Sequence, residues 1–401
     1  MEIIRGLCSF EGRLTGTDAE RRAANRLAER LQAQGRKAEI EPTHVHPQIG
    51  LVLAAHCALA FAGSLLSIAE PVAGFALVLT AAFSLYFDLN TRFYLLRRLV
   101  FRRASQNVFS LGGRADASAQ LILVAHYDAA RTGYIHNARS RRRLARIPPG
   151  ARGVLAPPRL LFWSVAALLP ILGARTAGLD ESWISLIQLV PTLALLVALF
   201  LLVDIELSDV VPAANDNASG VALALSVAEE LDANPPRHLD VCVLLTGGNE
   251  CLMEGMRGFV RAQRRQLERG STYFLALEML GRGPLLQYLT AEGLAVTYQH
   301  STRLTQLCEA IATASTEQGA DLDAAPAALP TATDALPATL AGYPALTLRR
   351  AADDGLPGLE HHTAADSPDG IEPDALEHSE RFALELIRQL DRDVGRRAGE
   401  R

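Results

Sequence analysis

The stretch LDVCVLLTGGNE (residues 239–250) contains the two features that decide the fold of this chain. Its apolar run, residues 241–245, is typical of a strand that is buried on both faces of a sheet. Small and polar residues then end the run and place Glu250 beyond the carboxyl end of the strand, where open α/β sheets bind their ligands. We therefore predict a central strand followed by a functional turn.

Similar strands alternate with helices along the chain. QLILVAHYD (residues 120–128) and TYFLALEMLG (272–281) also end in polar groups, whereas SGVALALSVAEEL (219–231) and DALEHSERFALELIRQLDRDV (374–394) have helical spacing. This alternation predicts an α/β fold in which a mixed central sheet is covered by helices on both faces. The Ala- and Pro-rich residues 321–338 are expected to form a surface loop.

The composition excludes several classes of protein. The 401 residues are 49% apolar and carry a net charge of −5, which argues against a nucleic-acid-binding face. Five cysteines without CxxC spacing indicate neither a zinc knuckle nor a disulfide framework, and they fit a reducing compartment. The first residues lack an apolar core of signal-peptide length, so no secretory signal is expected.

Four uncharged apolar runs account for the positive mean hydropathy of +0.13. The first and last, Ile49–Ala69 and Trp183–Val203, have 21 residues each and are long enough to cross a bilayer. Pro71–Phe87 and Leu160–Ala174 have 17 and 15 residues and are expected to be their hairpin partners. We predict four transmembrane helices in two inserted hairpins; the alternative is four buried core helices.

These hairpins predict how the chain is organised. Three polar segments form one domain around two hairpins: residues 1–48, hairpin 1 (49–88), residues 89–158 with the strand that ends at His126 and a basic loop, hairpin 2 (159–203), and residues 204–401.

Arginines predict the orientation in the membrane. They cluster in residues 92–103 and 139–159, between the second and third runs, whereas the short connections on the other side carry only Arg175. Because positive charge stays cytoplasmic, the domain and both termini are expected on the cytoplasmic side of the inner membrane, with the basic loop near anionic lipid.

The histidines and acids that follow the strands form a candidate metal site. Any one of them alone is more often structural, but together they supply nitrogen and oxygen ligands suited to one or two divalent metals, with zinc preferred. The candidates are His126, Asp128, Asp216, Glu250, Glu278, His361 and His362.

At these residues the chain resembles the di-zinc aminopeptidase and glutamate carboxypeptidase family, metallopeptidase family 28. The motifs that carry the resemblance are HYD, ANDNASG, TGGNE followed by EGM, LEMLG, TDALP and HHTAADSP, in this order between residues 12 and 373. The resemblance implies a zinc-exopeptidase-like fold and two zinc ions.

The resemblance also implies a role for each candidate. His126 would bind the first zinc and Asp128 would orient it, while Asp216 would bridge both metals. Glu250 and His362 would bind the second zinc. Two further positions depart from the usual pattern. Glu278, on the His126 side, stands where the family usually has aspartate, and His361 stands where some relatives have an oxyanion-stabilising tyrosine.

Asn249 is a larger departure, because the family has a glutamate there that takes a proton from the metal-bound water. An asparagine side chain can hold this water but cannot accept its proton at neutral pH. Three outcomes follow: a slow hydrolase, a pseudoenzyme that has lost activity, or a hydrolase in which another carboxylate, with Glu254 nearest in sequence, reaches the water.

We therefore expect a membrane-anchored zinc exopeptidase, foremost an aminopeptidase that cleaves peptides by a two-metal-activated water. Carboxypeptidase action and glutaminyl cyclisation are enzymatic alternatives. A non-catalytic membrane protein that binds metal and a peptide or protein partner is the alternative from another class. Since the second hairpin lies between His126 and Asp216, we expect the site close to the inner membrane surface.

Overall fold

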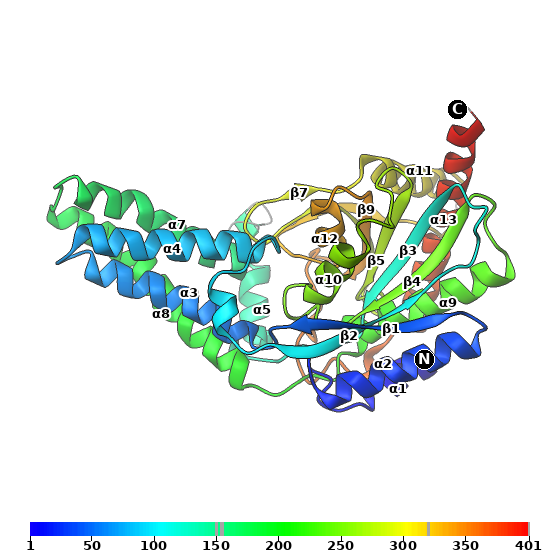
Figure 1. Cartoon of the computed structure of the whole chain (residues 1–401), viewed down its shortest axis with the longest axis horizontal. Coiled ribbons are helices and arrows are strands. Elements are labelled where there is room, and N and C mark those ends of the chain that lie inside the picture. Colours follow the sequence, from blue (N-terminus) through cyan, green and yellow to red (C-terminus); the bar gives the residue numbers. More distant parts are fainter. Residues whose placement is uncertain (149–150, 153–155, 319–320, 400–401) are drawn as a thin grey trace.

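Strand β3 (Ala119–His126) illustrates why the apolar runs form the centre of the sheet. Leu121 and Leu123 pack into the core on one face, and Ile122 and Val124 pack on the other. Because successive side chains of a strand point to opposite faces, both faces must be covered. The computed structural model, which describes residues 1–148, 151–152, 156–318 and 321–399, has helices on both faces of this sheet (Figure 1).

The described residues form a nine-stranded sheet in the order β1-β2-β4-β3-β5-β9-β6-β7, with β8 paired to β6. Strands β4, β3, β5 and β9 are mutually parallel, whereas β1, β2 and β7 pair antiparallel with their neighbours. The sheet is therefore mixed, as predicted. Besides β3, its strands are β1 (Ala38–Val45), β2 (Arg103–Ser110), β4 (Leu239–Thr246), β5 (Thr272–Glu278), β6 (Leu285–Glu292), β7 (Tyr298–Gln299), β8 (Ala325–Leu329) and β9 (Ala345–Ala351).

Helices cover the two faces unequally. One core cluster joins the sheet to α1 (Glu2–Cys8), α2 (Asp18–Ala33), α9 (Gly220–Ala233), α11 (Thr302–Gln318) and α13 (Pro373–Gly399). The other face packs against α10 (Glu254–Gln263) and α12 (Ala335–Leu340). Helices on both faces confirm the predicted fold class. The short elements are η1 (Leu96–Leu99), η2 (Tyr134–His136), α5 (Ala138–Ala145), η3 (Ala214–Ser219) and η4 (Pro368–Gly370).

One expectation from the sequence is wrong. Residues 321–338 are not merely a surface loop, because they contain β8 and most of α12, and Asp334 between them is buried. The small residues of β8 give little strand signal of their own. The strand forms because its backbone pairs with β6, a long-range contact that local composition does not reveal.

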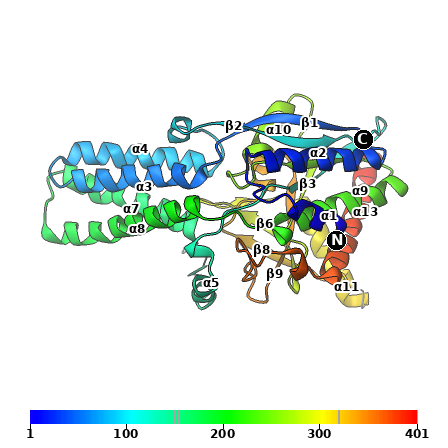
Figure 2. The same cartoon turned by 90° about the horizontal axis from the view of Figure 1, so that it is seen from below.

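Among the described residues, four helices are long and apolar enough to cross a membrane: α3 (Ile49–Leu66), α4 (Pro71–Leu89), α7 (Pro157–Thr176) and α8 (Ser182–Leu207). They form a bundle that extends from one side of the sheet domain in both views (Figures 1 and 2). Helices α4 and α7 are longer than the uncharged runs predicted, since they continue over charged residues at their ends, such as Asp88 and Arg175.

The bundle has small residues at its contacts and apolar residues on its outside. A Cβ atom on Gly74 would stand 2.5 Å from the carbonyl oxygen of Gly63, so the approach of α3 to α4 requires glycine. Val72 and Phe200 are 71% and 68% exposed. An apolar exterior of this kind suits contact with lipid rather than water.

Candidate active site

The parallel strands bring the predicted site residues to one edge of the sheet. His126 is the last residue of β3, Glu278 is the last of β5, and Glu250 follows β4. Asp216 lies in η3, which leads into α9, and His362 follows β9. The hairpin formed by α7 and α8 is inserted between β3 and η3. The site therefore lies at the sheet edge from which this hairpin departs.

Asp216 lies at the centre of the cluster. Its Oδ1 atom is 3.4 Å from Nε2 of His126, and its Oδ2 atom is 3.1 Å from Nε2 of His361 and from Nε2 of His362. Glu250 adjoins this cluster, with Oε1 3.7 Å from Nε2 of His362. Each carboxylate oxygen of Asp216 thus faces a different histidine group.

The ionisation of the cluster reflects burial and close charges. Burial opposes the negative charge of Asp216, but hydrogen bonds from the three histidines outweigh it and hold the pKa of this carboxyl group well below its usual range. Burial lowers the pKa of His362, and the carboxylates Glu250 and Asp216 more than offset this and raise it to about 9. Burial raises the pKa of Glu250 to about 7. These groups thus depend on one another for their charge, as metal ligands commonly do.

Asp128 holds the frame of the site together. Its carboxylate accepts hydrogen bonds from the Thr15 hydroxyl at 2.7 Å and from the backbone N–H groups of Glu250 at 3.0 Å and Asn249 at 3.2 Å. Its Oδ1 atom is also 3.4 Å from Nδ1 of His126. A carboxylate behind a ligand histidine fixes the orientation of the ring, the role that the resemblance implies for Asp128.

Glu278 is placed differently from the other predicted ligands. It is buried at the end of β5, but its carboxylate does not join either described group of site ligand atoms that lie within 4.8 Å of one another. Burial raises the pKa of Glu278 well above its usual value. The next strand, β9, places the buried Arg349 in register with it. Among the described residues, Oε1 of Glu278 and two guanidinium nitrogens of Arg349 have no hydrogen-bond partner.

Asn249 lies near the carboxyl group of Asp334, a neighbour that the sequence did not predict. Its amide nitrogen makes no hydrogen bond to a described residue, but it lies near enough to Asp334 to lower the pKa of that group. Burial dominates and raises the pKa of Asp334 to about 6. Glu254, the carboxylate nearest in sequence, is held elsewhere, since its Oε1 atom is 2.9 Å from Nδ1 of His46 and 3.5 Å from Nη1 of Arg97.

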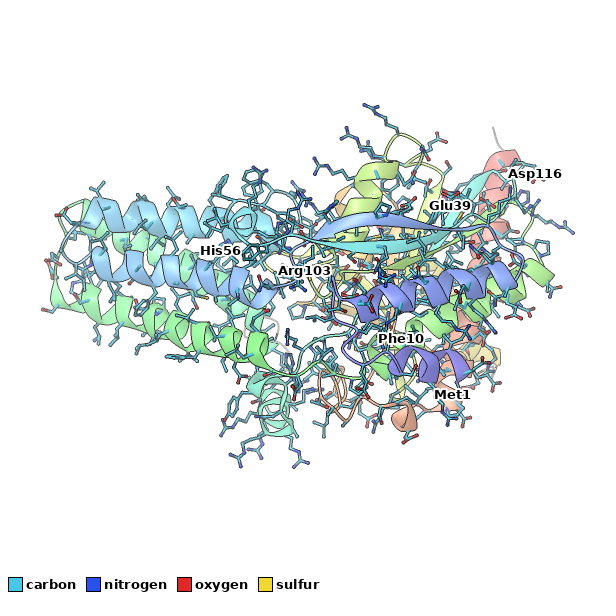
Figure 3. The ribbon with its side chains drawn as sticks, turned by 60° about the horizontal axis from the view of Figure 1, so that its bottom comes forward. Met1, Phe10, Glu39, His56, Arg103 and Asp116 are labelled. Carbon is cyan, nitrogen blue, oxygen red and sulfur yellow. The ribbon has the colours of Figure 1, made fainter. Side chains whose placement is uncertain are left out.

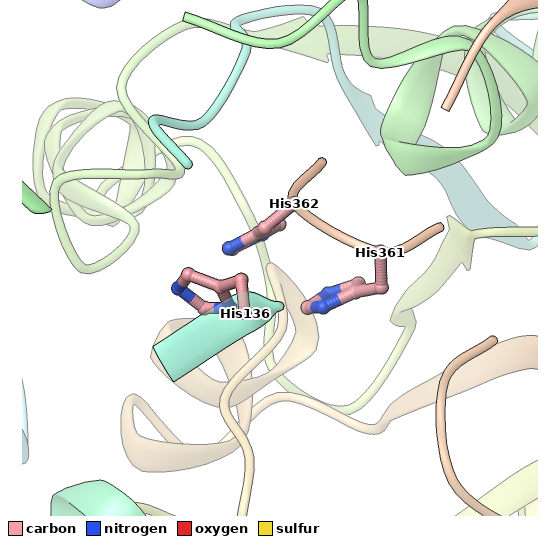
Figure 4. Close-up of side chains that lie close together, drawn as sticks. All are labelled: His136, His361 and His362. Carbon is pink, nitrogen blue, oxygen red and sulfur yellow. The ribbon is translucent and has the colours of Figure 1, made fainter. Parts of the chain in front are cut away.

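His136 was missed by the sequence reasoning. It belongs to η2, in the segment inserted before α7, and its ring centroid is 4.7 Å from that of His362 and 6.2 Å from that of His361 (Figure 4). The rings of His361 and His362 stack at 3.9 Å. Burial, together with the two other histidines, lowers the pKa of His136 to about 2, so its ring is neutral. A histidine shortly after the HYD motif was the available signal.

The residues present suit zinc. Two groups at this site offer ligand atoms within 4.8 Å of one another, namely His126 with Asp216 and Glu250, and His136 with His361 and His362. Imidazole nitrogen and carboxylate oxygen are ligands that zinc prefers. The arrangement can therefore hold a metal that activates water or polarises a carbonyl group.

Comparison with known proteins agrees with this chemistry. Residues 203–387 match the model of Peptidase family M28. The structure is similar to a zinc-dependent exopeptidase from Parabacteroides distasonis, at 12% identity and a TM-score of 0.53, covering 96% of this chain and 95% of that chain. None of the curated proteins searched matches the chain.

Two further solved structures have the same fold. A leucine aminopeptidase precursor from Bacteroides thetaiotaomicron is 14% identical with a TM-score of 0.54, and the match covers 96% of this chain and 94% of that chain. A glutaminyl cyclase from Tannerella forsythia is 15% identical with a TM-score of 0.54 and 96% of each chain covered. One fold thus carries both peptide hydrolysis and glutaminyl cyclisation.

Proposed function

Because residues 203–387 match the model of Peptidase family M28, we propose that this chain is a membrane-anchored zinc exopeptidase of the aminopeptidase type. The observation that carries the proposal is the position of Asp216, whose two oxygens face His126 on one side and His362 on the other. A carboxylate in this position is suited to bridge two zinc ions.

The residues around Asp216 would have distinct roles. His126 would hold one zinc, and Glu250 and His362 would hold the other. Glu278, which lies outside the close group of ligand atoms, would have to turn its carboxylate toward His126 to join the first zinc. Bound zinc would polarise the scissile carbonyl group and acidify a water molecule. Asp128 keeps the ring of His126 oriented and fixes the backbone that carries Glu250.

Proton transfer is the step that this site supports least. The Asn249 amide can orient a water molecule by hydrogen bonds but cannot take its proton. Glu254 is occupied by His46 and Arg97. We therefore propose a slow hydrolase that lacks general-base assistance, a contribution usually worth about 10² to 10⁴ in rate.

The membrane part of the proposal rests on the four apolar helices and on charge. We propose that they cross the inner membrane, with the sheet domain on the cytoplasmic side. The connection on that side carries the clusters of arginines at residues 92–103 and 139–159, as the positive-inside rule requires. The site would then act on peptides close to the cytoplasmic membrane surface.

Asn249 also favours a second function, a metal-binding protein that binds a peptide or protein partner without cleaving it. The two functions share the metal cluster and differ in turnover. A non-catalytic site has no use for a proton carrier, so an asparagine at this position is no loss to it.

One experiment separates the two functions. The detergent-purified protein is analysed for zinc content and assayed against a panel of aminoacyl-anilides. We expect bound zinc and slow, zinc-dependent hydrolysis, both reduced in His126→Ala. The matched control is His238→Ala, because His238 lies just before β4, at the opposite end of that strand from the site. Bound zinc without turnover on any anilide would leave the binding function in place of the enzyme.

A further inference from the structure

A large basic hollow lies away from the metal cluster, between the segment that follows α4 and helix α10. Its volume is about 980 Å³. The segment after α4 contributes Arg92, Arg98 and Arg102 to the lining. Figure 3 labels Arg103, the next residue, at the junction between the bundle and the sheet.

Helix α10 and the turns after it form the opposite wall. They contribute Arg257, Arg261, Arg264 and Arg269. None of the seven arginines lies within 4.0 Å of a carboxylate of the described residues, although the chain as a whole has a net charge of −5. Seven guanidinium groups that have no ion-pair partner among the described residues surround one hollow and create a strong positive field that attracts anions.

The acidic residue in the lining does not cancel this field. Glu254 is buried, and its carboxylate is already shared by His46 and Arg97. Arg97 is itself buried and also forms an ion pair with Asp88 at the end of α4. Glu254 is thus held by His46 and Arg97 rather than by the arginines of the hollow, and its single negative charge stands against seven positive ones in the lining.

The two walls of the hollow are fixed to each other. The guanidinium group of Arg257 stands 4.0 Å from the ring centroid of the buried Tyr94, and that of Arg97 stands 4.3 Å from the same ring. Arg257 also donates a hydrogen bond of 2.8 Å to the backbone carbonyl of Arg92. Arg257 therefore joins the two walls of the hollow and holds them in a fixed arrangement.

The same segment exposes apolar side chains beside its arginines. Leu99 is 82% exposed and Phe101 is 81% exposed, next to Arg98 and Arg102. The segment begins where α4 ends, and α4 is one of the four helices apolar enough to span a membrane. Large apolar side chains flanked by cations are typical of a surface that enters the headgroup region of a bilayer.

We propose that this hollow binds the phosphate headgroup of an anionic phospholipid, with Leu99 and Phe101 in the acyl boundary beside it. Guanidinium groups bind phosphate through paired N–H donors, which explains the abundance of arginine. The exposed apolar pair favours a lipid over a free phosphate compound, which has no acyl chain to cover it. The inference rests on the proposed membrane insertion.

The test measures lipid retention by the full chain. The detergent-purified protein is titrated with phosphatidylglycerol or with phosphatidylcholine of the same acyl chains, and bound lipid is counted by native mass spectrometry. We expect preferential retention of phosphatidylglycerol. Each of Arg257→Gln and Arg264→Gln should weaken it about fivefold. Arg265→Gln is the matched control, because Arg265 is an exposed neighbour that does not line the hollow.

Each outcome decides one point. Equal retention of both lipids, or equal losses in Arg264→Gln and Arg265→Gln, overturns the proposal. Displacement of the lipid by an equal concentration of inorganic phosphate or glycerol 3-phosphate assigns the site to soluble anions and also overturns it. Arg264 is exposed, so its variant stays informative if Arg257→Gln does not fold. Membrane insertion and anilide hydrolysis are measured on the same preparation, so their failure is distinguishable from failure of lipid binding.

Discussion

The ring of His136 packs against that of His362, with centroids 4.7 Å apart. His136 belongs to the segment that leads into α7, whereas His362 follows the last strand of the sheet. The insertion that carries two of the apolar helices therefore also contributes a side chain to the candidate metal site. The bundle and the site are structurally connected.

We predict that His136→Ala lowers zinc affinity about 10- to 100-fold, the usual effect of removing a group that supports a metal site. The neutral ring of His136 can bind zinc or brace His362, and alanine does neither. Competition with a chelator measures the affinity. His136→Phe keeps the ring packing without the nitrogens, so normal affinity in this variant would show that packing alone matters.

His361 and His362 should differ although both reach Asp216 at 3.1 Å. His362 also faces Glu250, so His362→Ala should remove one zinc ion, whereas His361→Ala should largely spare the zinc content and reduce turnover. Metal analysis of the two purified variants tests this. Loss of zinc in His361→Ala alone would exchange the roles of the two histidines.

Asn249→Glu should raise aminopeptidase activity by about 10²-fold or more, the usual scale of general-base assistance. The new carboxylate would lie near Asp334, and a neighbouring carboxyl group favours the protonated form of both. Turnover of an aminoacyl-anilide measures the gain. Asn249→Gln is the matched control, because it adds the same length without a proton acceptor. A rate unchanged in Asn249→Glu, with zinc still bound, would favour the binding function.

Buried Glu20 should make stability depend on pH. Its carboxylate accepts hydrogen bonds of 2.7 Å from Gly16 N–H and from the Ser105 hydroxyl, but burial dominates and raises its pKa to about 8. A carboxyl group whose pKa is raised in the folded state stabilises the fold in its protonated form. This contribution is complete below the pKa of the unfolded chain and is lost as pH rises toward 8.

We therefore expect Glu20→Gln to gain on the order of 2 kcal/mol of stability relative to the native chain between pH 6 and pH 8. Thermal unfolding midpoints of both proteins at the two pH values measure the difference. Glu11→Gln serves as the exposed control. Parallel pH profiles for the native chain and Glu20→Gln would mean that Glu20 does not titrate in this range.

The membrane topology should be visible with reporter fusions. Gly178 lies between α7 and α8, on the side opposite to the sheet domain. Fusions at Gly178 and at the C-terminus should therefore report opposite sides of the membrane, with the C-terminus cytoplasmic. Reports from the same side would contradict four spans.

The sequence predicts those parts of the structure that depend on local patterns of residues. The apolar runs that end at His126 and Glu278 form parallel strands. A strand that is buried on both faces is a continuous apolar run, so local sequence alone identifies it. The ends of parallel strands meet at one edge, so the candidate residues from β3, β4 and β5 came together without further information. Their metal-binding roles stay predictions.

The remaining features depend on long-range contacts. Strand β2 is partly polar and becomes a strand by pairing with β1 and β4. Asp334 reaches Asn249 only because β8 and α12 fold back onto the sheet. His136 reaches His362 only because the inserted segment folds back onto the loop after β9. Local sequence can mark such residues as candidates, but it does not encode these long-range contacts.

The hydrogen bonds of Asp128 have a consequence for how this site can change. They hold the main-chain nitrogens of residues 249 and 250, and not the side chain at position 249. The turn consequently keeps its shape whichever residue occupies that position. A substitution there can therefore change the side chain at position 249 while the backbone that carries Glu250 stays where it is. The scaffold of this turn and the chemistry of its central side chain are thus set by different atoms, so position 249 is free to vary on a constant backbone.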